Sequence, residues 1–387
     1  MTKSNSIPPD NSNRLVSAVV GIVAWNEEEN IQAAIDSLLQ QTLFADLAKK
    51  NEVCQIICVC NGCVDNTVSI ARNLLEAASR THPFCSAIAY KMVELEQPSK
   101  TNALNHLFQI AAPDDAEMLI VMDADITLHA PASLSNLCAA LRANPKAWFS
   151  IPAAIKQASS SDASSAVTSL SEKGTALHAV GTPDKPNWVP GQLYCVRRAI
   201  AKAIYFPKEL MAEDMFLSML AHTHFLSNPS ASIDKDTIVK AANASYVFAP
   251  YLGVRDILSN QKRQAMAHVI QELLVEWADA ELDDSQKGTV ALAKRLEAQD
   301  MRDAGWIKQR LETRLQQRKL FWKLLPNMYY TWPLRAAFEG AGRGGISLLP
   351  VAFLRTGLHL AGLYLANSAF RRGQTYFWAD KRTSEAA

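Results

Sequence analysis

The sequence lacks an excess of charge of either sign. Its 387 residues carry 39 lysines and arginines against 38 aspartates and glutamates, a net charge of +1 at pH 7. Proteins that bind nucleic acid through its phosphates usually present an excess of basic residues, so this balance gives no support for a nucleic-acid partner. Hydrophobic residues make up 49% of the chain, which is enough for a large globular core. The length suggests two domains, or one large domain with an appendage.

Cysteine pairs and long apolar runs are also missing. The seven cysteines are odd in number and show no spacing typical of a secreted disulfide framework, so we expect free thiols in a reducing compartment. Residues 1–14 are polar and have no apolar segment of a secretory signal. No stretch reaches the roughly 18 uninterrupted apolar residues of a simple membrane span. The nearest approach, 344–370, is broken by Pro350, Arg355 and His359. We therefore expect the chemistry to take place in the cytoplasm.

Apolar runs alternate with helical patterns in the first part of the chain. Nearly continuous apolar runs predict buried strands, and segments with helical spacing separate them. We expect strands at 15–25, 53–60, 118–122 and 147–155, and helices beginning near Ile31 and at 66–79. This alternation predicts an α/β fold, a mostly parallel sheet flanked by helices.

Polar residues follow three of these runs directly, where a parallel sheet binds its ligands. The clusters are Trp-Asn-Glu-Glu at 25–28, Asn-Gly-Cys-Val-Asp at 61–65 and Asp-Ala-Asp at 123–125. Asp123 and Asp125 are hard oxygen ligands at one strand end, a donor set that suits Mg²⁺ or Mn²⁺ together with a diphosphate. An ordinary acidic turn is the alternative for this short motif.

Five motifs in order resemble those of the family 2 glycosyltransferases with the GT-A fold. The family has N-E-E, D-G-S-x-D, G-K-x-x-A-L-N, D-x-D and E-D. This chain has Asn-Glu-Glu at 26–28, Asn-Gly-Cys-Val-Asp at 61–65, Ser-Lys-Thr-Asn-Ala-Leu-Asn at 99–105, Asp-Ala-Asp at 123–125 and Glu-Asp at 213–214. The resemblance covers about residues 16–268. It implies inverting transfer of a sugar from a nucleotide-diphosphate donor to an acceptor hydroxyl.

The resemblance also implies roles for single residues. Trp25, Glu27 and Asn61 would line the nucleotide pocket, and Lys100 would lie near the phosphates. Asp123 would contact the ribose and the metal, and Asp125 would ligate the metal. Asp214 would be the general base with Glu213 beside it, although the start of a helix is the alternative for this pair. These roles are given only by the resemblance.

The acceptor side is expected around residues 188–194. Trp188 and Tyr194 could stack on a sugar, and Gly191 would allow close backbone approach. Two core aromatics beside a turn are the alternative. Asp65 precedes a predicted helix, and we interpret it as a helix cap rather than a catalytic residue.

Three departures from the family pattern narrow the expectation. Asn61 replaces the common Asp and offers a hydrogen-bond donor as well as an acceptor, so the identity of the nucleotide base is left open. Cys63 replaces a Ser. Arg263 stands one place early for the Q-x-x-R-W motif of processive synthases and Ala265 stands where its Trp would be, so we expect a non-processive enzyme. Arg263 is a candidate for the diphosphate, with surface helix charge as the alternative.

The rest of the chain predicts a lid and a helical extension. Serine-rich residues 157–171 are typical of a mobile loop, and 272–319 is rich in charge and helix formers. We expect a flexible terminus at 1–14, a catalytic domain at 15–270 and a helical region at 271–387. Apolar residues 348–365 suit either an interfacial helix or a core helix. The first would place the protein at the inner face of the cell membrane with a lipid-linked or carbohydrate acceptor.

These expectations combine into a transferase of polysaccharide or glycolipid assembly. One rival is a non-catalytic scaffold subunit that keeps the fold; the joint presence of Asp123, Asp125 and Asp214 argues against it. A nucleotidyltransferase would need a glycine-rich loop with Arg after the first strand, and Trp25-Asn26-Glu27-Glu28 has none. A zinc site at Cys54, Cys58, Cys60 and Cys63 is disfavoured by its geometry. The sugar, base, acceptor, linkage and oligomeric state are left open.

Overall fold

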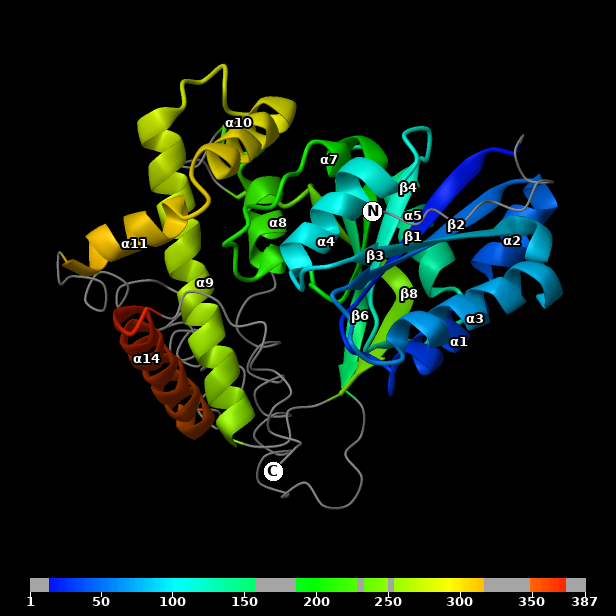
Figure 1. Cartoon of the computed structure of the whole chain (residues 1–387), viewed down its shortest axis with the longest axis horizontal. Helices are drawn as coiled ribbons and strands as arrows, with labels where there is room; N and C mark the ends of the chain where they lie inside the picture. Colours follow the sequence, from blue (N-terminus) through cyan, green and yellow to red (C-terminus); the bar gives the residue numbers. More distant parts are fainter. Residues whose placement is uncertain (1–13, 157–185, 228–232, 250–253, 317–348, 374–387) are drawn as a thin grey trace.

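An eight-stranded mixed sheet forms the centre of the protein (Figure 1). The computed structural model describes residues 14–156, 186–227, 233–249, 254–316 and 349–373. The strand order is β3-β2-β1-β4-β7-β6-β8-β5, in which β3, β2, β1 and β4 are parallel and β7 is antiparallel to β4. The strands are β1 (Val16–Ala24), β2 (Val53–Asn61), β3 (Ile88–Leu95), β4 (Met118–Asp123), β5 (Thr127–Leu128), β6 (Phe149–Lys156), β7 (Leu193–Arg197) and β8 (Ile238–Phe248).

Helices cover both faces of this sheet. The first set is α1 (Ile31–Leu39), α2 (Leu43–Lys50), α3 (Thr67–Thr81) and α5 (Ser133–Ala143). The second set is α4 (Lys100–His106) with the π-helix η2 (Leu107–Ala111), α7 (Arg198–Lys202) and α8 (Glu213–His222). A short 3-10 helix, η1 (Cys85–Ala87), precedes β3. The predicted fold class, a mostly parallel sheet flanked by helices, is confirmed, with four of the seven strand pairings parallel.

The two faces form two separate apolar cores because successive side chains of a strand point to opposite sides. In β1, Val19 and Val23 pack against the face that carries α4, η2 and α8. Val20 and Ile22 pack against the face that carries α1, α3 and α5. Burial on both faces is the reason that β1, β2 and β4 consist of nearly continuous apolar residues.

Close packing holds the π-helix onto the sheet. A Cβ at Gly21 would lie 2.2 Å from Leu107 Cδ2, so β1 needs a residue without a side chain at this position. The carbonyls at the end of η2 are bound by a buried arginine. Arg198 donates to Phe108 O at 2.7 Å and to Ala112 O at 2.8 Å. These bonds satisfy carbonyl groups that a helix end leaves without partners.

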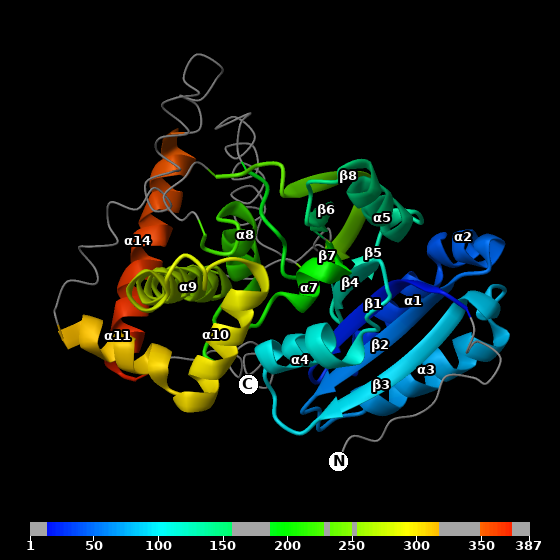
Figure 2. The ribbon, with the colours of Figure 1, turned by 90° about the horizontal axis from the view of Figure 1, so that it is seen from above.

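The C-terminal helices pack together beside the sheet, away from α1, α2 and α3 (Figures 1 and 2). They are α9 (Val254–Glu281), α10 (Thr289–Arg302), α11 (Trp306–Gln316) and α14 (Leu349–Arg371). The helical expectation for 272–319 is met for residues up to 316. Because α9 is continuous through residue 270, the expected domain boundary falls within a helix.

Asp300 joins the C-terminal helices to the sheet domain. It is 1% exposed and accepts hydrogen bonds from Tyr205 Oη at 3.0 Å and Lys208 N at 2.8 Å. Its other oxygen accepts from Trp306 Nε1 at 2.8 Å. One buried carboxylate thus binds a loop of the sheet domain and the start of α11.

The helix α14 is long and apolar enough to cross a membrane by length and composition, and 39% of its most apolar window is buried within the protein. It packs along α9, where His359 and Thr356 are buried. Its outer face exposes Phe353 at 60% and Tyr364 at 65%. The packing on α9 agrees with the alternative of a core helix for one side of α14. An interfacial role for its exposed side stays a prediction.

Replacing Gly362 tests the packing of α14 on α9. A Cβ at Gly362 would lie 2.6 Å from Gln261 Cβ and 2.7 Å from its carbonyl carbon, so Gly362→Ala must push the helices apart. We expect a loss of about 1–3 kcal/mol in the free energy of unfolding. Gly357 lies on the same helix with nothing within 4 Å of its Cβ position. Gly357→Ala should therefore be neutral or stabilise, by up to about 1 kcal/mol. Equal effects of the two changes in urea titrations would contradict this packing.

Candidate active site

The three polar clusters meet at one edge of the sheet, as predicted. The strands β2, β1 and β4 are adjacent and parallel, and Asp123 pairs with Val23 at their carboxyl ends. The turn after β4 is held by its backbone, because Asp123 N donates to Gln192 O at 2.8 Å and Ala124 N to Val23 O at 3.2 Å. Asp123 and Asp125 therefore lie at the end of a strand whose backbone is held by hydrogen bonds to its neighbours.

Lys100 joins distant parts of the chain at this edge. Its ammonium lies 2.9 Å from Asp123 Oδ2 and 2.6 Å from Glu213 Oε1. It also donates to Gly191 O at 3.3 Å. The three side chains are only 13%, 17% and 14% exposed for Lys100, Asp123 and Glu213 respectively. Ser99 places the lysine, because its side chain caps α4 by accepting from Asn102 N.

Burial and mutual charge set the protonation of this cluster. Burial, reinforced by the Asp125 and Glu213 carboxylates, raises the pKa of Asp123 to about 7 although Lys100 opposes it. Burial alone would lower the pKa of Lys100, but Asp123 and Glu213 together raise it above its ordinary value. Burial likewise works against ionisation of Glu213, yet Lys100 lowers its pKa overall. Lys100 is therefore a permanent cation in a strongly acidic site.

Asp214 lies beside this cluster at the start of α8. The N-cap residue of this helix, Ala212, has a left-handed conformation with φ +58°, which is uncommon for a residue with a side chain. Burial and the neighbouring Glu213 raise the pKa of Asp214, while Arg263 opposes the rise. A raised pKa suits a carboxylate that accepts a proton near neutral pH. The pair begins a helix, as the structural alternative expects, and it also lines the charged cluster. The role of Asp214 as general base stays a prediction.

Gly191 allows α8 to approach the loop before β7. A Cβ there would lie 3.1 Å from Glu213 Oε1 and 3.4 Å from Asp214 Cβ, tighter than the usual contact to a side-chain oxygen. A side chain at residue 191 would require the Glu213 carboxylate to shift by a few tenths of an ångström. The predicted close approach is to protein groups, and the acceptor role of Gly191 stays a prediction.

Asp125 has an oxygen that no protein group satisfies. Its Oδ1 is buried and has no hydrogen-bond partner in the described part of the chain. A buried carboxylate oxygen without a partner is costly and fits a cation ligand. Within the described ranges, no group of three or more His, Cys, Asp or Glu side chains is arranged to hold a metal. Asp123 and Asp125 would therefore hold Mg²⁺ or Mn²⁺ only with oxygens from a substrate, as Mg²⁺ commonly binds.

The expected nucleotide pocket lies between the loops that follow β1 and β2. Glu27 is half-buried, and its Oε2 accepts from Asn30 Nδ2 at 2.9 Å. Trp25 is also half-buried at the end of β1. Asn61 is completely buried, and its Oδ1 accepts from Ser99 N at 3.0 Å. The Asn61 side chain thus positions the residue before Lys100, in addition to the contact with a base that the sequence predicts.

Asp65 binds the backbone as a cap, in agreement with the structural interpretation. Its Oδ1 accepts from Thr67 N at 3.0 Å at the start of α3, and its Oδ2 accepts from Glu28 N at 3.2 Å. Cys63 makes long contacts of 3.5 Å to Asn26 N and Ala24 O. These bonds join the loops after β1 and β2 into one wall.

The acceptor-side residues differ in exposure. Trp188 is 48% exposed and packs edge-on against His222 with ring centroids 5.1 Å apart. Tyr194 is completely buried in β7 and packs against Phe149, which is the core alternative. Its hydroxyl has no partner among the described residues, and burial followed by the Glu213 charge raises its pKa well above the ordinary value. Trp188 is thus the aromatic with a face available to a sugar.

Sequence reasoning missed three residues that support the site. Asn105 binds both backbone groups of Phe206. Its Nδ2 donates to Phe206 O at 2.8 Å, and its Oδ1 accepts from Phe206 N at 2.8 Å. Its place at the end of the 99–105 motif could have signalled this. Gln192 accepts from Tyr246 Oη at 3.0 Å, and the pKa of Tyr246 is raised by burial and by Asp123. The sequence around Tyr246, in a strand with several polar residues, does not predict that this tyrosine lies near Asp123.

The cysteines of β2 are buried in the core. All seven cysteines are free, and Cys58 Sγ lies 3.8 Å from Cys60 Sγ. Burial raises the pKa of Cys54 above its ordinary range, so this thiol stays protonated. The expectation of free thiols is met.

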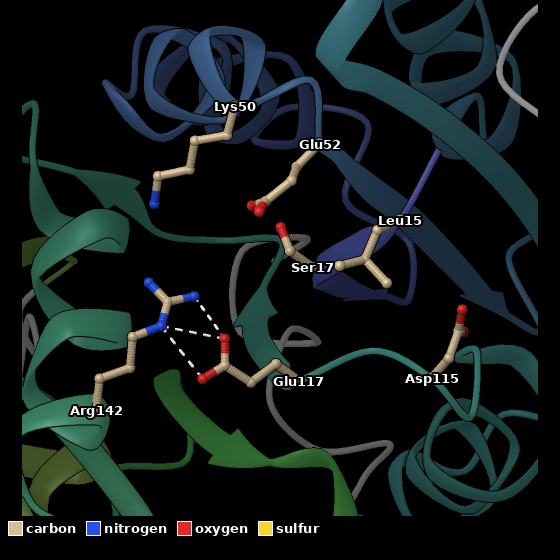
Figure 3. A pocket seen from close by; sticks show the side chains of 7 residues that line it. All are labelled: Leu15, Ser17, Lys50, Glu52, Asp115, Glu117 and Arg142. Carbon is tan, nitrogen blue, oxygen red and sulfur yellow. Dashed lines mark hydrogen bonds and ion pairs between the residues drawn. The ribbon is translucent and has the colours of Figure 1, made fainter. Parts of the chain in front are cut away.

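A separate pocket lies at the opposite end of the sheet (Figure 3). It is lined by Leu15, Ser17, Lys50, Glu52, Asp115, Glu117 and Arg142. Glu117 is bound there by Arg142, with Nε–Oε2 3.1 Å. Because it lies at the amino ends of β1 and β4, it is distinct from the charged cluster.

Residues 19–180 match the family described as "Glycosyl transferase family 2". The predicted resemblance to this family is confirmed for these residues, which include four of the five motifs. The chain has no match among curated protein sequences.

Several solved structures are similar to this chain. The mannosyltransferase PcManGT from Pyrobaculum calidifontis, in complex with GDP-Man and Mn²⁺, has a TM-score of 0.50 and 18% identity over 95% of this chain and 90% of its own. S. aureus TarS 1-349 with UDP has a TM-score of 0.42 and 14% identity over 92% of each chain. Glucosyl-3-phosphoglycerate synthase from Mycobacterium tuberculosis has a TM-score of 0.42 and 17% identity over 71% of this chain and 81% of its own. At these identities the first similarity establishes the GT-A fold alone.

Proposed function

We propose that the protein is an inverting, non-processive glycosyltransferase that uses a nucleotide-diphosphate sugar. The observation that carries the proposal is the meeting of Asp123, Glu213 and Lys100 at the carboxyl edge of the sheet, with Asp214 next to Glu213. These residues come from segments far apart in the chain. The family match and the GDP-Man complex of PcManGT support a donor of this class.

Asp214 is the proposed general base. An attacking acceptor hydroxyl must lose a proton, and a carboxylate whose pKa is raised by burial and by Glu213 is suited to take it. Lys100 and Arg263 supply positive charge for a departing diphosphate. Trp188 offers its exposed face to the acceptor.

Asp125 and Asp123 are the proposed ligands of Mg²⁺ or Mn²⁺. When bound, such an ion would stabilise negative charge on the diphosphate. The unsatisfied Oδ1 of Asp125 supports this assignment. PcManGT is described with Mn²⁺, which gives the ion to test first.

A panel of nucleoside diphosphates with Mn²⁺ tests donor and metal together. One base should raise the Tm, because a ligand at a hundredfold excess over its Kd stabilises by about 2.7 kcal/mol. Asp125→Asn should lose the part of this shift that depends on Mn²⁺, whereas the exposed Asp284→Asn should keep it. A sugar nucleotide of the selected base should then slowly release its nucleoside diphosphate. If no nucleotide stabilises the protein, or if Asp125→Asn responds to Mn²⁺ like the wild type, the assignment is wrong.

We further propose a cytoplasmic protein that touches a membrane surface through α14 and acts in polysaccharide or glycolipid assembly. Phe353 and Leu354 are 60% and 50% exposed, and this supports an apolar contact. The double change Phe353→Ser and Leu354→Ser should reduce cosedimentation with anionic vesicles several-fold. Met301→Ser, which removes a side chain 76% exposed on α10, should not. Equal binding by both variants would exclude α14 as the contact.

A further inference from the structure

The ammonium of Lys100 occupies a cation position formed by three oxygens. Asp123, Glu213 and Gly191 supply one oxygen each, at 2.9, 2.6 and 3.3 Å from Nζ. An ammonium has three hydrogens, so these acceptors satisfy it completely. The oxygens come from the end of β4, the start of α8 and the loop before β7, so the lysine holds three segments together.

The same ammonium competes for a proposed metal ligand. Asp123 carries its ion pair with Lys100 on Oδ2, whereas Asp125, two residues on, has an unsatisfied oxygen. A positive charge in contact with one of two carboxylates weakens the attraction of that pair for a second cation. The described residues also provide no third acidic, histidine or cysteine ligand nearby. Without a nucleotide, the protein should therefore bind a divalent ion only weakly.

We propose that Lys100 is the resident counter-ion of the nucleotide-free site and couples metal binding to nucleotide binding. A diphosphate offers the ammonium other anionic oxygens, and transfer of Lys100 to them releases Asp123 for the metal. The diphosphate also supplies the missing metal ligands. Metal and nucleotide therefore bind together, and neither binds well alone. The inference rests on the proposed function and makes Lys100 a positioning residue for the metal.

Mn²⁺ binding to the full-length protein tests this inference without measuring turnover. Free Mn²⁺ is counted by electron paramagnetic resonance, with and without the nucleoside diphosphate that the Tm panel selects. For the wild type, we expect the nucleotide to tighten Mn²⁺ binding at least about tenfold, within the usual range of coupling. In Lys100→Gln, nucleotide-free Mn²⁺ binding should be tighter than in the wild type, and the added effect of the nucleotide should shrink.

Two further variants separate charge from shape and from general surface effects. Lys100→Arg keeps the positive charge and should keep weak nucleotide-free binding. Lys50→Gln removes a lysine at the opposite end of the sheet and should behave as the wild type. Nucleotide-free Mn²⁺ binding in Lys100→Gln that is unchanged or weaker would overturn the inference.

The inference can still be tested if the Lys100→Gln variant does not fold. If Lys100→Gln fails to fold because two carboxylates are left unpaired, Mn²⁺ should restore its folded circular dichroism and raise its Tm more than that of the wild type. Failure of Mn²⁺ to do so would also overturn the inference. The proposed function fails separately, when the wild type binds no nucleoside diphosphate in the presence of Mn²⁺.

Discussion

Asp214→Asn should reduce metal-dependent release of nucleoside diphosphate by roughly 10²–10⁴-fold, the usual contribution of a general base. The amide cannot accept the proton of an attacking hydroxyl or water. It keeps the oxygen that accepts from Met215 N at 2.8 Å, so the start of α8 should be preserved. The measurement is the single-turnover rate of donor hydrolysis with Mn²⁺.

The control is binding, because a base acts after the donor has bound. The Tm shift of Asp214→Asn with Mn²⁺ and nucleoside diphosphate should equal that of the wild type. Asp284→Asn, an exposed carboxylate far along the chain, should retain the full rate. A wild-type rate in Asp214→Asn would remove this residue from the mechanism and would favour a non-catalytic relative of the family.

Asp300→Ala should lower the free energy of unfolding by about 3–5 kcal/mol, because one buried donor and two partly buried donors lose their acceptor at once. Tyr205 Oη, Lys208 N and Trp306 Nε1 all donate to this carboxylate. Urea denaturation followed by tryptophan fluorescence suits the measurement, since Trp277 and Trp306 pack with ring centroids 5.1 Å apart. The change should appear first as separation of the C-terminal helices.

Asp279→Ala is the matched control for this loss. Asp279 also belongs to the helical region and pairs with Lys287 at 3.1 Å, but its side chain is 53% exposed. Exposed ion pairs contribute about 0–1 kcal/mol, so a small effect is expected. A loss below 1 kcal/mol in Asp300→Ala would show that the C-terminal helices are held by other contacts.

The buried parallel strands could be predicted because their burial is written in continuous apolar residues. The expected strands at 15–25, 53–60 and 118–122 became Val16–Ala24, Val53–Asn61 and Met118–Asp123. The strand β8 escaped prediction because it includes the exposed residues Lys240 and Asn243, which interrupt its apolar pattern. The predicted lid at 157–171 lies outside the described residues.

The sequence predicted which residues belong to the candidate site, but not the contacts that they make with one another. A short motif predicts Lys100 as a phosphate contact. Nothing in the sequence predicts its ion pair with Glu213 or the hydrogen bond from Ser99 N to Asn61. Such pairings depend on where α8 and α4 meet after folding. For Tyr194 the sequence left an acceptor contact and a core position open, and its side chain is completely buried.

The helix α9 has 28 residues and is therefore about 42 Å long at 1.5 Å per residue. It carries Arg263, whose charge acts on Asp214, and further along Glu272, which pairs with Arg314 of α11 at 3.0 Å. A helix of this length bends little, so a movement at one end of α9 is transmitted to the other end. A displacement of α11 or α14 that moved α9 would change the distance between the Arg263 guanidinium and Asp214, and with it the pKa of that carboxyl.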